Sequence, residues 1–185
     1  CDLDIVNPYF RTKDSEGVLQ ELDIELISSP FANSNVDLPA IPAAAEKMFS
    51  GDARRVVIDV GGDDSGALAL GRYAPRMNRE GADMMLVINR YRQFTQTVQD
   101  VEEIIREIEA ASHLRFTGIV NNSNIGEETT AATVLDSLPF ANQVAAQTGL
   151  PLCGTAFVER LASELDGKVP HPFPINIFKK TIWDI

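Results

Sequence analysis

The chain has little of what marks nucleic-acid-binding and membrane proteins. It carries 16 Lys and Arg residues against 27 Asp and Glu, so the formal net charge of its 185 residues is −11. An excess of negative charge disfavours binding to a phosphate backbone and docking on an anionic membrane. No apolar run approaches the length of a membrane span, and we expect no signal peptide. We therefore predict a cytoplasmic protein whose partners include no nucleic acid and no membrane.

Cysteine and histidine are also scarce. Cys1 and Cys153 show no metal-type spacing, and neither His113 nor His171 has an acidic or thiol neighbour at ligand spacing. We therefore expect no zinc site. Both cysteines lie in apolar, strand-like sequence, which predicts buried thiols in a reducing compartment.

What the chain does have is a regular alternation of apolar, β-branched runs with segments of helical periodicity. Hydrophobic residues make up 44% of the sequence and are spread along its length, which suffices for a full core. This alternation predicts βαβ units, and therefore a three-layer α/β fold with a mostly parallel sheet and helices on both faces. Residues 1–185 are predicted to form a single domain.

The expected elements follow from this alternation. The predicted strands cover residues 1–6, 24–27, 55–60, 84–89, 116–121 and 152–156, with an edge strand near 175–178. The predicted helices cover residues 15–22, 42–49, 65–76, 97–112, 127–135, 139–148 and 159–165. The clearest is 97–112, because its apolar positions follow helical spacing and Thr95 or Thr97 can cap it. Pro139 is expected to open a separate helix.

The stretch Arg55–Gly66 is the one around which the chain is organised. A β-branched apolar run ends at Asp59 and is followed by Gly61 and Gly62. Such a run predicts a strand buried on both faces of a parallel sheet. An acid at the carboxyl end of that strand lies where open α/β sheets bind ligands, and glycines after it let backbone amides approach an anion. The pattern is typical of a Walker B strand; the alternative is that Asp59 caps a turn.

Polar residues end other predicted strands as well. Asp2 and Asp4 end the first strand, and Asn121 and Asn122 end the strand 116–121. Because the carboxyl ends of parallel strands meet at one edge, we expect these groups to converge with Asp59. Two acids with Mg²⁺ suit phosphoryl transfer, and an asparagine amide can pair with an adenine edge. The alternatives are an Asx turn at the acids and a strand-ending turn at the asparagines.

In this order the motifs resemble the ParA/MinD family of P-loop ATPases, whose phosphate-binding loop is a deviant Walker A sequence. The resemblance rests on DLDIVNP at residues 2–8, VVIDVGG at 56–62 and GIVNN at 118–122, and it covers nearly the whole chain. The family shares its core with nitrogenase iron protein, dethiobiotin synthetase and cobyrinic acid a,c-diamide synthase. The resemblance implies a P-loop NTPase-like fold with ATP and Mg²⁺ as cofactors.

The resemblance also implies a role for each matching residue. Asp4 matches the catalytic aspartate that positions the hydrolytic water, and Asp59 matches the Walker B acid that holds Mg²⁺ through water. Asn122 is a better match than Asn121 to the asparagine that recognises adenine. The implied nucleotide-binding residues are Asp2 near the metal, Gly61 and Gly62 at the γ-phosphate, and Asn121 and Asn122 at the base.

The chain departs from the family at the phosphate-binding loop. It contains no GxxxxGK[ST] sequence, and the acidic turn 61–66 has no lysine that could substitute. The family places this loop and the strand before it upstream of Asp4. We therefore expect a domain that is incomplete at its amino end, lacks the P-loop strand and binds ATP poorly or not at all. The strand edges left open favour a homodimer or other homo-oligomer.

Two functions fit the resemblance. The first is a switch ATPase, in which ATP-dependent dimerisation controls an unknown protein partner. The second is an ATP-dependent biosynthetic ligase or amide synthase of the cobyrinic acid a,c-diamide synthase or dethiobiotin synthetase type. The cobyrinate type usually adds a glutaminase domain, for which the chain has no room, and this favours the first. Arg90 and Arg92 either clamp an anion or a partner carboxylate, or are solvated loop charges.

Overall fold

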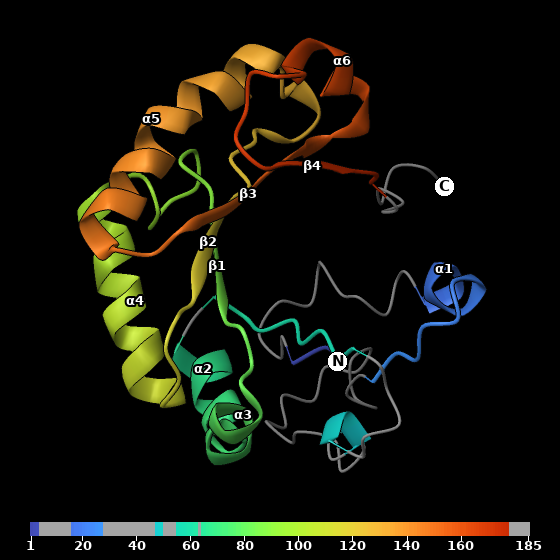
Figure 1. Ribbon diagram of the computed structural model, residues 1–185, viewed down its shortest axis with the longest axis vertical. Coiled ribbons are helices and arrows are strands. Elements are labelled where there is room, and N and C mark those ends of the chain that lie inside the picture. The colour runs from blue at the N-terminus through green and yellow to red at the C-terminus, as the bar shows by residue number, and fades with distance from the viewer. Residues whose placement is uncertain (4–15, 28–46, 50–54, 63, 178–185) are drawn as a thin grey trace. The chain divides into compact units, whose positions relative to one another are not determined.

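The computed structural model describes residues 1–3, 16–27, 47–49, 55–62 and 64–177 (Figure 1). These residues form two compact units, which we call unit 1, within Cys1–Ala74, and unit 2, Pro75–Ile177. The single domain expected from the sequence stays a prediction.

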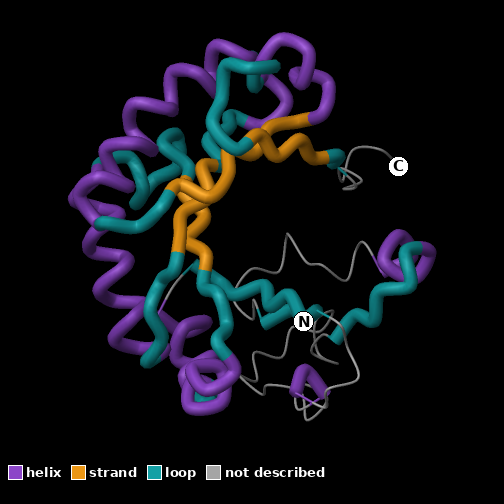
Figure 2. The backbone as a smooth tube through the Cα atoms, viewed as in Figure 1, coloured by secondary structure: helices purple, strands orange, loops and turns teal. Residues whose placement is uncertain are grey.

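Unit 2 is built on a sheet of parallel strands. Its four strands lie in chain order, β1-β2-β3-β4, and every neighbouring pair is parallel (Figure 2). The strands are β1 (Met85–Ile88), β2 (Gly118–Asn121), β3 (Leu152–Val158) and β4 (Pro172–Ile175). The prediction of an α/β fold with a parallel sheet is confirmed, whereas its P-loop NTPase-like arrangement stays a prediction.

The connections of unit 2 are helical. They are α4 (Val98–Ser112) after β1, η3 (Gly126–Glu128) and α5 (Ala131–Thr148) after β2, and η4 (Glu159–Leu161) and α6 (Ala162–Leu165) after β3. Right-handed crossovers between strands in chain order place successive helices on one face of the sheet. Figure 1 shows α4 and α5 together on one side of the sheet. On the other face of β1, Met85 and Val87 are exposed, so helices on both faces stay a prediction.

The ends of the two long helices follow from their sequences. In α4, Thr97 Oγ1 accepts a hydrogen bond from the Asp100 N–H (3.2 Å), and Asp100 Oδ2 accepts one from the Thr97 N–H (2.9 Å). This capping box satisfies amides that the first turn leaves unpaired. Thr130 and Thr133 form the equivalent box of α5, which ends at Gly149 with φ 72°.

The structure corrects the prediction of two separate helices over residues 127–148. α5 is one continuous helix that contains Pro139. A proline inside a helix removes a hydrogen bond and costs about 3 kcal/mol. The apolar face of α5 offsets this cost, because Val134, Phe140, Ala141 and Val144 are all buried on it.

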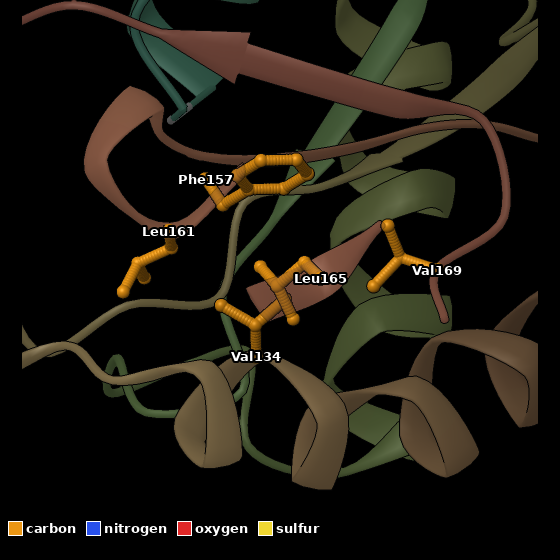
Figure 3. Close-up of a cluster of buried hydrophobic side chains, with 5 residues drawn as sticks. All are labelled: Val134, Phe157, Leu161, Leu165 and Val169. Carbon is orange, nitrogen blue, oxygen red and sulfur yellow. The ribbon is translucent and has the colours of Figure 1, made fainter. Parts of the chain in front are cut away.

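The core beside α5 is formed with β3 and the segment that follows it (Figure 3). Its buried members are Val134, Phe157, Leu161, Leu165 and Val169. β4 lies upstream of the predicted edge strand 175–178 and includes Pro172 and Pro174. In the sheet order β4 has β3 as its hydrogen-bonded neighbour and lies at the edge, where a missing N–H is tolerated.

Burial of the cysteines was predicted wrongly for Cys153, which is exposed, while Cys1 is half-buried. The β2–β3 ladder shifts register between Ile119 and Val120. A Cβ placed on Gly118 would lie 2.4 Å from Cys153 Sγ, so the thiol lies over the glycine on the face of β2 that carries no side chain there. The thiol is therefore outside the core between the sheet and α5.

Unit 1 contains α1 (Glu16–Glu21) and α2 (Asp64–Gly71). α1 confirms the first predicted helix, but the helix predicted over 65–76 is divided into α2 and α3 (Ala74–Glu80). The division has a local cause, because Gly71 ends α2 and Pro75 favours the first turn of a new helix. No helix among the described ranges is long and apolar enough to cross a membrane.

Candidate functional site

The backbone of unit 1 places Asp2 and Asp59 side by side. The Asp59 N–H donates to the carbonyl of Cys1, and the Leu3 N–H donates to the carbonyl of Asp59, both at 2.8 Å. These bonds make an isolated parallel bridge between Asp2 and Asp59. Residues paired across parallel segments point their side chains to the same face. Two of the acids predicted to converge therefore leave the same face of one short ladder.

The surroundings of this acid pair differ between its members. Asp2 is buried, with 7% of its surface exposed, whereas Asp59 is exposed. Burial lowers the pKa of the Cys1 α-ammonium group, and the carboxylates of Asp2 and Asp59 act against that shift. The carboxylates thus create a negative potential that stabilises a nearby cation. Asp4, the predicted catalytic residue, lies outside the described residues.

The segment that carries Asp59 is less buried than predicted. Val57, which the sequence placed in a strand buried on both faces, is 80% exposed. The Val57 carbonyl accepts a hydrogen bond from the Cys1 amino group at 2.7 Å, and pairing with Cys1–Leu3 continues at Asp59. Among the described residues this pairing reaches Asp59 at the carboxyl end of the predicted strand, while Val56 and Val57 before it are exposed.

A tight glycine turn follows Asp59 and leads into α2. A Cβ on Gly66, in the first turn of α2, would lie 2.9 Å from the carbonyl oxygen and 3.1 Å from the nitrogen of Gly61. Only glycine lets the helix begin this close to the turn. The amino end of α2 therefore lies beside Gly61. At Gly62 a Cβ would meet nothing within 4 Å, which leaves its backbone open to close approach by a ligand.

In unit 2, Asn121 points into the core rather than to the edge of the sheet. Its Nδ2 donates to Ser137 Oγ on α5 (2.9 Å), and its Oδ1 accepts from Ser123 Oγ (2.6 Å) and from the Ser123 N–H (3.2 Å). Asn121 is 1% exposed. These bonds occupy the amide, so it has little capacity left for a base.

Asn122 differs from its neighbour. It is half-buried, and its N–H donates to the carbonyl of Ile88 at 2.9 Å, which joins the ends of β1 and β2. Its side-chain amide has no hydrogen-bonding partner among the described residues. Of the two asparagines predicted for the base, Asn122 is therefore the one with a donor and an acceptor to offer.

Sequence reasoning missed the residues that fix the loops around Asn122. Asn89, after β1, clamps the backbone of Asn124: its Nδ2 donates to the Asn124 carbonyl (3.1 Å), and its Oδ1 accepts from the Asn124 N–H (3.2 Å). Arg160, after β3, donates to the carbonyls of Glu127 and Thr129 (3.0 and 2.7 Å). The sequence signal that could have identified Asn89 and Arg160 is their position, because each follows the carboxyl end of a strand.

The small number of clustered acidic and other metal-ligating side chains limits the metal chemistry that the described residues support. Among the residues that the structure describes, no group of three or more His, Cys, Asp or Glu side chains could hold a metal ion. The Asp2–Asp59 pair and the Gly61–Gly62 turn belong to unit 1, and Asn122 belongs to unit 2. Their convergence on one ligand stays a prediction.

Comparison of the chain with protein-family models, with curated proteins and with solved structures found no match.

Proposed function

We propose that the chain belongs to a ParA/MinD-like switch ATPase, in which ATP-dependent dimerisation controls a protein partner. The observation that carries the proposal is the parallel bridge between Asp2 and Asp59, followed directly by the Gly61–Gly62 turn at the amino end of α2. An acid pair beside open backbone amides is the arrangement that a metal-bound polyphosphate requires.

The acid pair fits Mg²⁺ better than a softer metal. Mg²⁺ prefers oxygen ligands, keeps several waters and is commonly held by one or two carboxylates together with substrate phosphates. In this proposal Asp59 holds the ion's waters and Asp2 lies beside them. When bound, Mg²⁺ neutralises charge on the phosphates of ATP.

The remaining roles in this proposal are those that the family resemblance implies. The amide of Gly62 donates to the γ-phosphate, and its open surroundings leave room for that contact. Asp4 orients the attacking water. Asn122 offers its unpaired amide to the adenine edge, whereas the amide of Asn121 is bonded to Ser137 and Ser123.

The proposal also explains why ATP should bind weakly here. The turn 61–66 contains no lysine that could offset the charge of the triphosphate. Dimerisation is proposed on a separate ground. β1 lies at the edge of the described sheet, and an unpaired edge can add a strand from another molecule.

Calorimetric titration with Mg·ATP tests the proposal. We expect weak binding by this chain, with a Kd of about 1 mM or more. Asp59→Ala should abolish binding, and Asp83→Ala, which removes an exposed acid of unit 2, should leave it unchanged. Equal binding by the two variants would contradict the assignment.

A further inference from the structure

The loop that leaves β1 holds a large aromatic residue in an unfavourable backbone conformation. This loop, Asn89–Thr97, is called the Arg–Phe loop below. Phe94 has φ 72°, in the left-handed region that side chains with a Cβ rarely adopt, and it is 71% exposed. Because the Phe94 side chain is exposed, its burial contributes little free energy that could offset the backbone strain. Strained residues persist where the surroundings fix them, and they cluster at functional sites.

The surroundings do fix this loop. Asn89 binds it at several points: its carbonyl accepts from Thr95 Oγ1 (2.6 Å) and the Arg92 N–H (3.1 Å), and its Oδ1 accepts from the Tyr91 N–H (3.0 Å). Tyr91 Oη donates to the carbonyl of Thr133 on α5 (2.8 Å). The backbone on both sides of Phe94 is thus preorganised, which lowers the entropy lost when a partner binds.

The same loop is locally basic in an acidic chain. Residues 84–99 contain Arg90 and Arg92 and no acid, although the whole chain has a formal charge of −11. Both arginines are exposed, and neither forms an ion pair with a described residue. The Cζ atom of Arg90 lies 5.9 Å from the centroid of the Phe140 ring, and this cation–π contact restrains the guanidinium group.

We propose that the Arg–Phe loop is a docking site for a short acidic segment of a protein partner. Its carboxylates would pair with Arg90 and Arg92, and an adjacent apolar side chain would cover Phe94. Arginine and aromatic side chains dominate the energy of protein interfaces, and guanidinium groups bind carboxylates in a bidentate manner. The proposal goes beyond the ATPase, because this docking requires neither Mg²⁺ nor nucleotide.

The local charge favours a peptide over a nucleic acid. Nucleic-acid binding draws most of its affinity from many phosphate contacts along a dense line of charge. The two arginines of this loop supply few such contacts. A short peptide with a few carboxylates and an apolar residue matches the size and chemistry of this loop.

Fluorescence anisotropy with labelled synthetic peptides tests the proposal. The probe is a peptide in which glutamates flank a Trp-Leu pair, and its control replaces every glutamate with glutamine. We expect binding of the acidic peptide only, weakened at least about tenfold by Arg92→Gln and by Phe94→Gly. Arg106→Gln and Phe173→Ala, which alter another exposed arginine and another exposed aromatic, should leave the Kd unchanged.

Phe94→Gly also separates binding from folding. Glycine adopts φ 72° without strain, so this variant should melt at the same or a higher temperature while it loses the peptide. The proposal is overturned if the acidic peptide shows no binding at about 1 mM. Equal binding of the glutamine peptide, unchanged binding by both loop variants, or tighter binding of a single-stranded oligothymidine would overturn it as well.

Discussion

The sheet of unit 2 and the Asp2–Asp59 bridge of unit 1 are both parallel pairings, yet they are held differently. The sheet has three ladders, capped helices and a buried amide network between β2 and α5. The bridge is an isolated pairing held by short backbone hydrogen bonds. Substitutions in unit 2 should therefore change stability, whereas those at the acid pair should change ligand binding with little effect on stability.

The largest effect is expected when the buried network of unit 2 is broken. Asn121→Ala leaves the hydroxyls of Ser123 and Ser137 without their amide partner and opens a cavity, so it should lower the free energy of unfolding by about 3 kcal/mol. Urea denaturation measures this loss. Asn122→Ala is the matched control and should cost less than about 0.5 kcal/mol, because its amide is unpaired. Equal losses would contradict the difference assigned to the two asparagines.

A smaller loss of stability is expected at the close contact between Gly66 and Gly61 in unit 1. Gly66→Ala forces a Cβ to within 2.9 Å of the Gly61 carbonyl and should destabilise the chain by about 2 kcal/mol. Gly62→Ala meets nothing within 4 Å and should change stability by less than about 1 kcal/mol. Thermal unfolding of the two variants gives the comparison. If they unfold alike, the approach of α2 to the Gly61–Gly62 turn does not hold the site.

The smallest effect is expected at Pro139, the proline inside helix α5 of unit 2. Pro139→Ala restores a helical N–H in α5 and removes a ring that crowds the carbonyl of Leu135, while it frees the unfolded chain. The net result should be a stabilisation of about 1–2 kcal/mol, visible as a higher urea midpoint. A lower midpoint would mean that Pro139 has a packing role, and the account of α5 would have to change.

The sequence predicted some elements of unit 2 correctly and others wrongly. The sequence placed β1, β2, β3 and α4 correctly, because these elements carry local signals such as the capping threonine Thr97 and an apolar helical face. It missed the continuity of α5, since a proline costs a fixed amount locally but the buried face that offsets it depends on tertiary packing. β4 was misplaced for a similar reason, because Pro172 and Pro174 are tolerated only at a sheet edge.

The candidate site was predictable in part. The carboxyl-end rule brought Asp2 and Asp59 together correctly. The carboxyl-end rule by itself did not distinguish Asn121 from Asn122, because the direction of a side chain at a strand end depends on the register of the strand. The preference for Asn122 came from the family resemblance. The Asn89–Asn124 clamp joins residues that are 35 positions apart, so no local pattern could reveal it.

In the proposed function, the acid pair and the amide of Gly62, all in unit 1, contact one metal nucleotide. The most direct test is to replace Mg²⁺ with paramagnetic Mn²⁺ and to follow the amide resonances of the chain with ATP present. Paramagnetic broadening reports even sparsely populated complexes, so weak binding does not hide the result. We predict that the amide of Gly62 broadens, and that Asp59→Asn removes the effect. Absence of broadening at Gly62, or broadening that Asp59→Asn leaves unchanged, would contradict a metal-nucleotide site at the acid pair.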